Sequence, residues 1–203
     1  MCHVVFMAKK SAFPSKLRSR LFTWAEAKRL GVSWNEIQRQ LKNGDLERVS
    51  LGIYRTPIDD RNEANHTYEE EQFRVATIRL GKPAAVCLVS ALVVYGLTDL
   101  IPRTVWLLVP AEKHTRFKEV RLFRKRDPKF NIGIIRKDGY WITSIERTLA
   151  ECLVERRRVG TNTAVEALRK AISEKQTTLS KVLDTAIKLG FADRIRPYIE
   201  ALA

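Results

Sequence analysis

The sequence has few of the residues that build disulfide frameworks, metal centres or redox sites. Its three cysteines, Cys2, Cys87 and Cys152, are far apart, and none belongs to a Cys-x-x-Cys or Cys/His motif. An odd and scattered set of this kind argues against a disulfide framework and against a structural zinc. The three histidines also lack a partner at ligand spacing. We therefore expect reduced thiols, no metal ion and no cofactor.

Signatures of catalysis are missing as well. The chain has no Gly-x-Ser-x-Gly, no phosphate-binding glycine-rich loop and no His-Glu-x-x-His. It also lacks the Asp followed by a strand-borne Glu-x-Lys that a nuclease of the restriction type would need. We therefore do not expect an enzyme, and no residue is assigned a catalytic role.

Long hydrophobic runs are absent too. The longest apolar stretch, Pro83 to Leu97, is broken by Ser90 and is shorter than the roughly 20 residues of a membrane span. The apolar run at the start of the chain is too short for a signal peptide. These features predict a cytoplasmic protein with no membrane partner.

Positive charge, by contrast, is abundant. The 203 residues include 37 Lys and Arg against 23 Asp and Glu, which gives a net charge of +14 and a pI near 10.0. Residues 1–57 carry eleven basic and four acidic side chains, a net +7, whereas residues 58–150 carry +4 and residues 151–203 carry +3. A balance this basic favours a polyanionic partner. The density of positive charge is highest in the first 57 residues.

That same segment contains two consecutive helix-start motifs. Thr23-Trp-Ala-Glu26 and Ser33-Trp-Asn-Glu36 each have the form of a capping box, in which hydroxyl and carboxylate satisfy backbone N–H groups reciprocally. Gly31 separates the two helices, and Gly44 stands where a left-handed cap would end the second after about three turns. This arrangement predicts a helix-turn-helix, whose second helix enters a DNA major groove.

The second helix has two distinct faces. Trp34, Ile37 and Leu41 follow helical spacing and are predicted to point into the core. The opposite face carries side chains that pair with base edges, Asn and Gln with adenine and Arg with guanine. An ordinary solvated face is the alternative interpretation, although it would usually be richer in Glu. The predicted base-reading residues are Asn35, Gln38, Arg39 and Lys42.

A two-stranded hairpin is predicted after this helix, with strands at 45–50 and 53–56 joined at Leu51-Gly52. Pro57 ends the second strand because it cannot donate to a ladder. A hairpin in this position is a wing, and its polar side chains would hold phosphates, which adds affinity rather than sequence information. The predicted backbone and wing contacts are Ser33, Arg48, Ser50 and Arg55.

Residues 58–203 are predicted to form a second domain, which opens with a polar linker over 58–64. A third capping box, Thr67-Tyr-Glu-Glu70, would start a helix, and Ser90 would cap a short helix at 91–95. The fold class is therefore α+β, with a winged helix-turn-helix at 1–57 followed by a mixed α/β domain whose C-terminal part, about 144–203, is helical. The predicted strands are 84–89, 104–109, 120–123, and 132–137 with 140–143 around Asp138-Gly139, and the later helices begin near Thr143, Thr163, Ser180 and Ala192.

Two clusters of basic residues in this second domain need an interpretation. Arg156-Arg157-Arg158 closes a predicted helix, where cations interact favourably with the helix dipole. The run over 113–126 is either a second nucleic-acid surface or a solvated edge strand that carries charge. Its cations are Lys113, Arg116, Lys118, Arg121, Arg124, Lys125 and Arg126.

Three segments together resemble the AbiEi antitoxins of bacterial abortive-infection toxin–antitoxin systems. The first is the predicted helix-turn-helix and wing, from Phe22 to Arg55. The second, Val89-Ser-Ala-Leu-Val-Val-Tyr-Gly-Leu97, is similar to the family's Ser-Ala-x-x-x-x-Gly-Leu segment. The third, Ile142-Thr-Ser-Ile-Glu-Arg-Thr-Leu149, resembles its Thr-x-x-Arg-Thr-Leu segment. The order and spacing of all three are more specific than any one of them.

The resemblance implies an autorepressor that binds double-stranded operator DNA. It also implies an antitoxin that counteracts a cognate nucleotidyltransferase-like toxin without forming a stable complex with it. Arg147 lies in the third matching segment, where a structural role beside a helix start is an equal alternative. Two other functions stay open, a general winged-helix regulator whose second domain senses a ligand or partner, and a DNA-processing enzyme. A neighbouring nucleotidyltransferase gene would favour the antitoxin over the general regulator, and metal-dependent DNA cleavage would favour the enzyme.

Overall fold

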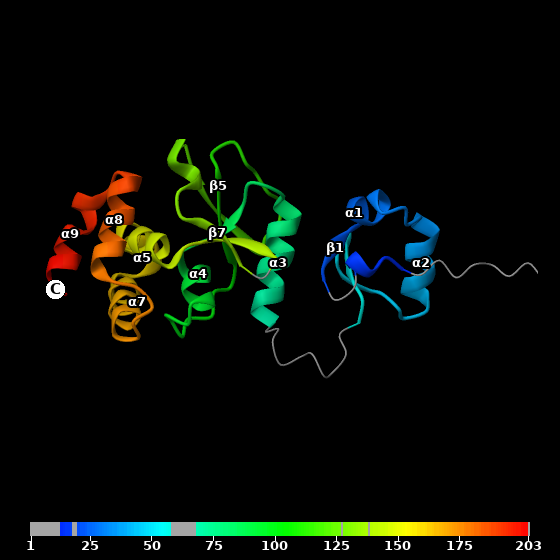
Figure 1. The fold of residues 1–203 in the computed structure, drawn as a ribbon, viewed down its shortest axis with the longest axis horizontal. Coiled ribbons are helices and arrows are strands. Elements are labelled where there is room, and N and C mark those ends of the chain that lie inside the picture. Colours follow the sequence, from blue (N-terminus) through cyan, green and yellow to red (C-terminus); the bar gives the residue numbers. More distant parts are fainter. Residues whose placement is uncertain (1–12, 18–19, 58–67, 127, 138, 203) are drawn as a thin grey trace, which may run out of the picture. The chain divides into compact units, whose positions relative to one another are not determined.

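A computed structural model describes residues 13–17, 20–57, 68–126, 128–137 and 139–202 of the chain. It is a mixed α/β structure with many helices and two separate sheets. The chain divides into two compact units, unit 1 from Met1 to Thr67 and unit 2 from Tyr68 to Ala203 (Figure 1). The expected linker at 58–64 and the cap at Thr67 lie outside the described residues.

Unit 1 combines short helices with a small antiparallel sheet, whose strand order is β1-β3-β2. Its core is built from Leu17, Phe22, Ile37 and Tyr54, all of which are buried. The elements of unit 1 are η1 (Ser15–Leu17), β1 (Phe22–Thr23), α1 (Trp24–Arg29), α2 (Trp34–Lys42), β2 (Glu47–Ser50) and β3 (Ile53–Arg55).

Unit 2 contains a five-stranded sheet of order β6-β5-β4-β8-β7. The neighbours β5 and β6, and also β4 and β8, are parallel, whereas β4–β5 and β7–β8 are antiparallel. The elements are α3 (Tyr68–Leu80), β4 (Ala85–Val86), α4 (Leu88–Val94), β5 (Val105–Pro110), β6 (Val120–Lys125), η3 (Pro128–Asn131), β7 (Ile134–Lys137), β8 (Tyr140–Thr143), α5 (Ile145–Val154), α6 (Arg156–Val159), α7 (Thr161–Ser173), α8 (Leu179–Leu189) and α9 (Ala192–Glu200).

Helices cover this sheet from both sides. Helix α3 lies on one side, and α5, α7, α8 and α9 form a bundle on the other (Figure 1). Because successive strand residues point to opposite faces, each strand contributes to two cores. In β5, Leu107 packs in the core beneath α3 while Trp106 and Leu108 pack in the core shared with the bundle. This double coverage explains why β5 is almost continuously apolar.

The segment after α3 differs from its sequence prediction. Instead of a strand over 84–89, β4 ends at Val86, and α4 begins at Leu88 with Cys87 at the cap position. The predicted cap Ser90 lies inside α4, where its Oγ accepts a hydrogen bond from Trp106 N at 3.0 Å. The prediction was wrong because Ser90 satisfies a backbone donor of another segment, a contact that local sequence does not encode.

Several other elements agree with the sequence. Strands β5, β6, β7 and β8 lie close to their predicted positions, and Gly139 has φ +89° in the turn between β7 and β8, while Asp138 lies outside the described residues. The cap of α5 is Ser144, one residue later than predicted, and its side chain accepts from Arg147 N. Within the described ranges, no helix is long and apolar enough to cross a membrane.

Candidate nucleic-acid interface

The helix pair of unit 1 is fixed at its start by hydroxyl caps. Thr23 Oγ1 accepts from Glu26 N at 3.3 Å, and Glu26 Oε2 accepts from Thr23 N at 2.8 Å, so the first capping box is confirmed. Ser33 Oγ accepts from Glu36 N at 3.1 Å, but the Glu36 carboxylate does not return to the cap. It binds Arg39 and Gln40 instead, so the second box is only half formed and that part of the prediction was wrong. A single cap bond still fixes where α2 begins.

The inward face of α2 is narrower than its sequence pattern predicted. Ile37 is fully buried and Leu41 packs at the edge of the core, as expected. Trp34, predicted to be buried, is 45% exposed. Its ring packs edge-on against Trp24, with the centroids 5.2 Å apart. Both tryptophans are the first residue of their helix. Trp24 packs against the core of unit 1, and Trp34 covers Trp24 from the solvent side instead of entering the core itself.

The outward face of α2 presents all four predicted base-reading side chains to solvent. Asn35, Gln38, Arg39 and Lys42 are each exposed and lie on the side of α2 away from the buried Ile37. Bidentate amide and guanidinium groups in this arrangement can read the edges of adenine and guanine. The structure therefore brings these four residues together on one helix face.

An acidic side chain sits among them. Arg39 Nη2 lies 2.6 Å from Glu36 Oε2, and Gln40 Nε2 donates to Glu36 Oε1 at 2.8 Å. The hydrogen bond from Gln40, reinforced by the Arg39 charge, holds the pKa of Glu36 below its usual value. The predicted base-reading role of Arg39 would therefore require it to exchange this carboxylate partner for a base or a phosphate. The i, i+3 spacing of Glu36 and Arg39 is the sequence signal for this pair, which the prediction of the base-reading face did not include.

The hairpin β2–β3 separates the predicted wing residues. Arg48 pairs in register with Tyr54 and is exposed, whereas Arg55 pairs with Glu47 on the opposite face of the ribbon. Arg55 Nε donates to Glu47 Oε2 at 2.8 Å. Ser50 is half-buried beside a register shift between Arg48 and itself. Of the three expected phosphate contacts on the hairpin, Arg48 is the most exposed and Arg55 already binds a carboxylate.

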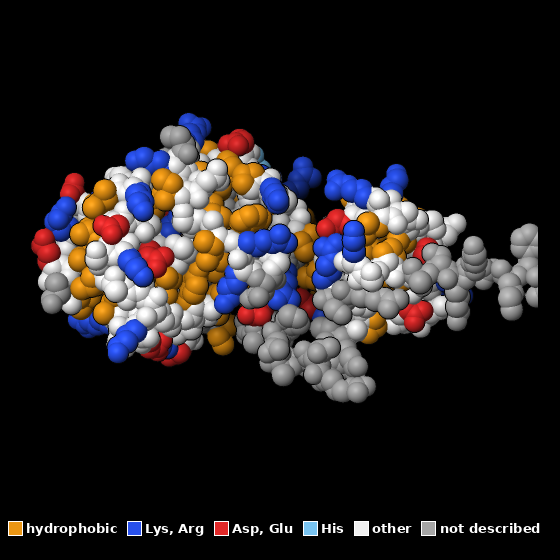
Figure 2. All heavy atoms as spheres, viewed as in Figure 1, with side chains coloured by type: hydrophobic (Ala, Val, Ile, Leu, Met, Phe, Trp, Pro, Cys, Tyr) orange, Lys and Arg blue, Asp and Glu red, His pale blue; other side chains and the backbone are white. Residues whose placement is uncertain are grey.

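The cations of the run 113–126 do not form one surface. Three of them precede β6, three lie on it and Arg126 follows it. Strand β6 is an edge strand of the sheet, as the edge-strand interpretation predicted. Arg121 packs over the Trp106 ring, 4.2 Å from the ring centroid, on the face of the sheet covered by the helix bundle. Arg124 is three residues further along β6 and points to the opposite face, which α3 covers. Lys125 lies 3.9 Å from the buried Glu151 Oε1. Lys and Arg side chains are correspondingly scattered over the visible face of unit 2 (Figure 2).

Arg156, Arg157 and Arg158 do not close a helix as predicted: α5 ends at Val154, and the three arginines begin the short helix α6 after Glu155. Arg156 Nη1 donates to the Leu153 carbonyl at 3.4 Å, and Arg158 Nε lies 3.3 Å from Glu155 Oε2. The cluster thus lies beside the C-terminal end of α5, where backbone carbonyls favour cations. This agrees with the structural interpretation of these arginines.

Arg147 has a structural role, which its sequence context left open. Its side chain is 2% exposed, and its Nη2 lies 3.2 Å from Oε1 of Glu151, which is 1% exposed. Burial raises the pKa of Glu151, and the neighbouring charges of Arg147 and Lys125 oppose that rise. Sequence analysis did not single out Glu151, although its i, i+4 spacing from Arg147 between leucines is a signal for an ion pair on one helix face.

The described part of the chain offers no group of three His, Cys, Asp or Glu side chains that could hold a metal ion. Cys87 and Cys152 are both fully buried, and this burial raises the pKa of each thiol well above its usual value. Neither cysteine has the lowered pKa and exposure of a reactive thiol.

Comparison with models of known protein families gave no match for this chain, and neither did a search of curated proteins.

Proposed function

We propose that this protein is a sequence-specific DNA-binding autorepressor, with unit 1 acting as a winged helix-turn-helix. The observation that carries the proposal is the outward face of α2. This face exposes two amide side chains, Asn35 and Gln38, and two cations, Arg39 and Lys42. The helix begins at a hydroxyl cap and is followed by a two-stranded hairpin. A helix of this kind supplies base-edge contacts in the major groove, while the hairpin supplies contacts to the backbone.

Charge supports the same proposal. The first 57 residues carry a net +7, which provides the sequence-independent attraction to phosphates that precedes base reading. The outward face of α2 carries two cations, Arg39 and Lys42. Of these, Arg39 forms an ion pair with Glu36 in the free protein. Exchange of such exposed pairs for phosphate is favourable because surface ion pairs contribute only about 0–1 kcal/mol.

We further propose that the protein is an antitoxin that counteracts a nucleotidyltransferase-like toxin, as the resemblance to AbiEi proteins implies. The order and spacing of the three matching segments, the third of which contains Arg147, support this part of the proposal. No side chain is assigned to toxin neutralisation. The general winged-helix regulator with a sensing domain is the alternative.

Footprinting on the DNA upstream of the protein's own gene tests the DNA-binding proposal. We expect a protected site for the full chain, and we expect Gln38→Ala or Arg39→Ala to weaken it by about 1–3 kcal/mol while relaxing the preference at single base pairs. Arg48→Ala should instead weaken all sequences alike and flatten the salt dependence.

Arg196→Ala is the matched control for Arg39→Ala. Arg196 also lies on an exposed helix face and pairs with an acid three residues earlier, Asp193, at 3.7 Å. It should leave the footprint unchanged. Absence of any protected site for the full chain would contradict the repressor proposal, and equal effects of both variants would show that charge alone drives binding.

A further inference from the structure

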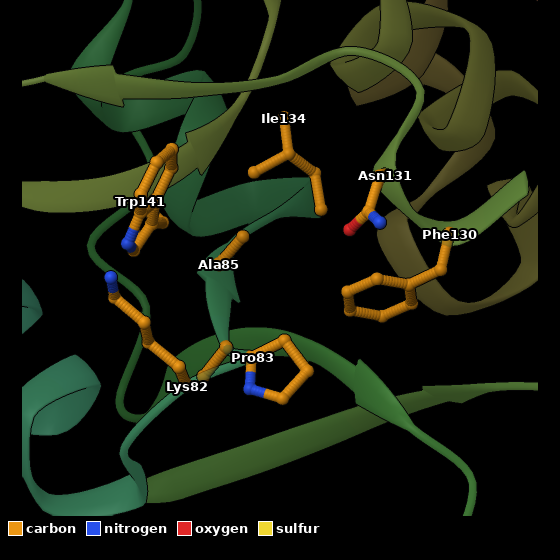
Figure 3. A pocket seen from close by; sticks show the side chains of 8 residues that line it. Lys82, Pro83, Ala85, Phe130, Asn131, Ile134 and Trp141 are labelled. Atoms are coloured by element: carbon orange, nitrogen blue, oxygen red, sulfur yellow. The ribbon is translucent and has the colours of Figure 1, made fainter.

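Unit 2 contains a hollow on the side of the sheet that faces away from α3. Its volume is about 320 Å³, which lies at the small end of ligand pockets. Most of its wall is apolar, and side chains from three strands and from η3 point into it (Figure 3). The lining residues are Lys82, Pro83, Ala84, Ala85, Phe130, Asn131, Ile134 and Trp141.

Strand alternation explains why the hollow exists. Tyr140 and Ile142 pack in the core beneath α3, so Trp141 between them points to the opposite face of β8. Ile134, paired with Thr143, points to this same face. Ala85 forms the floor between these side chains, where a residue without a long side chain leaves space (Figure 3).

Two polar side chains stand at separate ends of this apolar space. The Lys82 ammonium lies 5.5 Å from the centroid of the Trp141 ring, and Asn131 lies beside Phe130 on the other side (Figure 3). In the described part of the chain, no carboxylate forms an ion pair with Lys82. Arg136 is paired in register with Trp141 and therefore projects on the same side of the sheet. The Trp141 end of the hollow is thus positive.

The wall opposite Trp141 is held in place by the buried arginine of α5. Arg147 Nη1 donates to the Phe130 carbonyl at 2.6 Å and also to the Ile132 carbonyl. Glu151 fixes the same guanidinium from within α5. Gly133 follows with φ +65°, and a Cβ there would lie only 3.1 Å from Arg147 Cβ. The segment carrying Phe130 and Asn131 is therefore tied to α5 through Arg147.

We propose that this hollow binds a small planar aromatic carboxylate. The aromatic ring would lie between Trp141 and Phe130 over the Ala85 floor, and the carboxylate would bind the Lys82 ammonium. The apolar lining disfavours a sugar phosphate or a nucleotide, which would leave polar groups without partners. A neutral apolar molecule would make no charged hydrogen bond with the Lys82 ammonium at the positive end of the hollow. The proposal goes beyond DNA binding and gives unit 2 a ligand of stated chemistry.

Titration of the full ¹⁵N-labelled chain with 2-naphthoate, and separately with the neutral 2-naphthamide, tests this proposal. The four tryptophans give four indole N–H signals, and the signal that disappears in Trp141→Phe is assigned to Trp141. We expect 2-naphthoate to shift the Trp141 signal saturably and 2-naphthamide to bind more weakly. Lys82→Met should reduce naphthoate affinity roughly tenfold, as expected for a charged hydrogen bond, and change amide affinity little. Lys188→Met, on the exposed face of α8, is the control and should change neither.

Ala85→Leu should abolish the shift by filling the floor. Because Ala85 is buried, the binding result for this variant counts only if its amide spectrum shows a folded protein. Lys82 is exposed, so Lys82→Met decides the question in either case. The proposal is overturned if naphthoate gives no saturable shift at Trp141, if the acid and the amide bind equally, or if Lys188→Met weakens binding as much as Lys82→Met.

Discussion

Helices α2 and α5 start in the same way but differ in the burial of the ion pair that each carries. Each begins at a serine whose Oγ accepts from the backbone N–H three residues later, and each carries a Glu–Arg pair one turn apart. In α2 the pair is partly exposed, and the face around it is open to solvent. In α5 every residue from Arg147 to Val154 is buried.

The difference shows that burial, rather than residue type, sets what an ion pair does. An exposed pair is screened by water and can exchange its partner, which suits a surface that binds a polyanion. A buried pair cannot lose one member without leaving an uncompensated charge, so it fixes the elements around it. Arg39 is therefore expected to act in recognition, whereas Arg147 holds the wall of the hollow. Five predictions test this contrast and the proposed functions.

The largest effect is expected from removing the outward face of α2. The triple variant Gln38→Ala, Arg39→Ala, Lys42→Ala should lose operator binding, since each base contact contributes about 1–3 kcal/mol. It should remain folded, because these exposed side chains support no core. A gel-shift titration together with a thermal melt measures both properties.

The same triple variant tests whether repression and protection are separable. With the partner toxin and the variant both expressed from foreign promoters, cells should survive as they do with the unchanged protein. Full return of toxicity at equal protein level would tie protection to DNA binding and contradict the two-function proposal.

The buried pair gives the next largest effect. Arg147→Met should destabilise unit 2 by about 3–5 kcal/mol, because the buried Glu151 loses its hydrogen-bonded counter-charge and keeps only Lys125, at 3.9 Å. Urea unfolding, followed by amide signals of each unit, measures the loss. The double variant Arg147→Met, Glu151→Leu should recover much of it, and Arg39→Ala should change stability by no more than about 0.5 kcal/mol. Equal losses for Arg147→Met and Arg39→Ala would contradict the contrast between the two helices.

Smaller effects are expected at the start of α2. Ser33→Ala should reduce stability by about 1 kcal/mol, because an N–H of the first turn loses its acceptor. Trp34→Ala should have a similar effect, since a half-exposed aromatic pair contributes about 0.5–1.5 kcal/mol beyond the area that it buries. Thermal melts of both variants measure this. A loss of 3 kcal/mol or more for Trp34→Ala would instead fit a buried indole, as its sequence spacing predicted.

The smallest effect concerns the pH dependence of α2. The pKa of Glu36 is lowered in the folded chain from its usual 4.5, so its contribution to stability is present above that value and is lost as the pH falls through the lowered pKa. Glu36→Gln should therefore have a lower melting temperature than the unchanged protein at pH 7, and the difference should shrink as the pH falls below 4.5. The same variant should bind DNA slightly more tightly at pH 7, because Arg39 no longer has a carboxylate partner. Weaker binding would show that Glu36 positions Arg39 for DNA.

Local sequence was enough to predict much of unit 1 and several strands of unit 2. The hydroxyl caps at Thr23 and Ser33, the left-handed Gly44 at φ +78°, and the hairpin before Pro57 follow from rules that act within a few residues. The exposure of Asn35, Gln38, Arg39 and Lys42 also followed, because one apolar stripe defines the opposite face of a helix.

Tertiary structure decided what depends on partners distant in the chain. Ser90 accepts a hydrogen bond from Trp106 N instead of capping a helix, and Trp34 packs against Trp24 instead of in the core. Both contacts depend on residues that the fold brings close, which the spacing of residues within one helix does not predict. The role of Arg147 depended on carbonyls at Phe130 and Ile132, which only the fold brings to α5. The sequence determined which helix face was open and which residues could cap it. Packing determined which charges were buried, and with them which segments are held rigid.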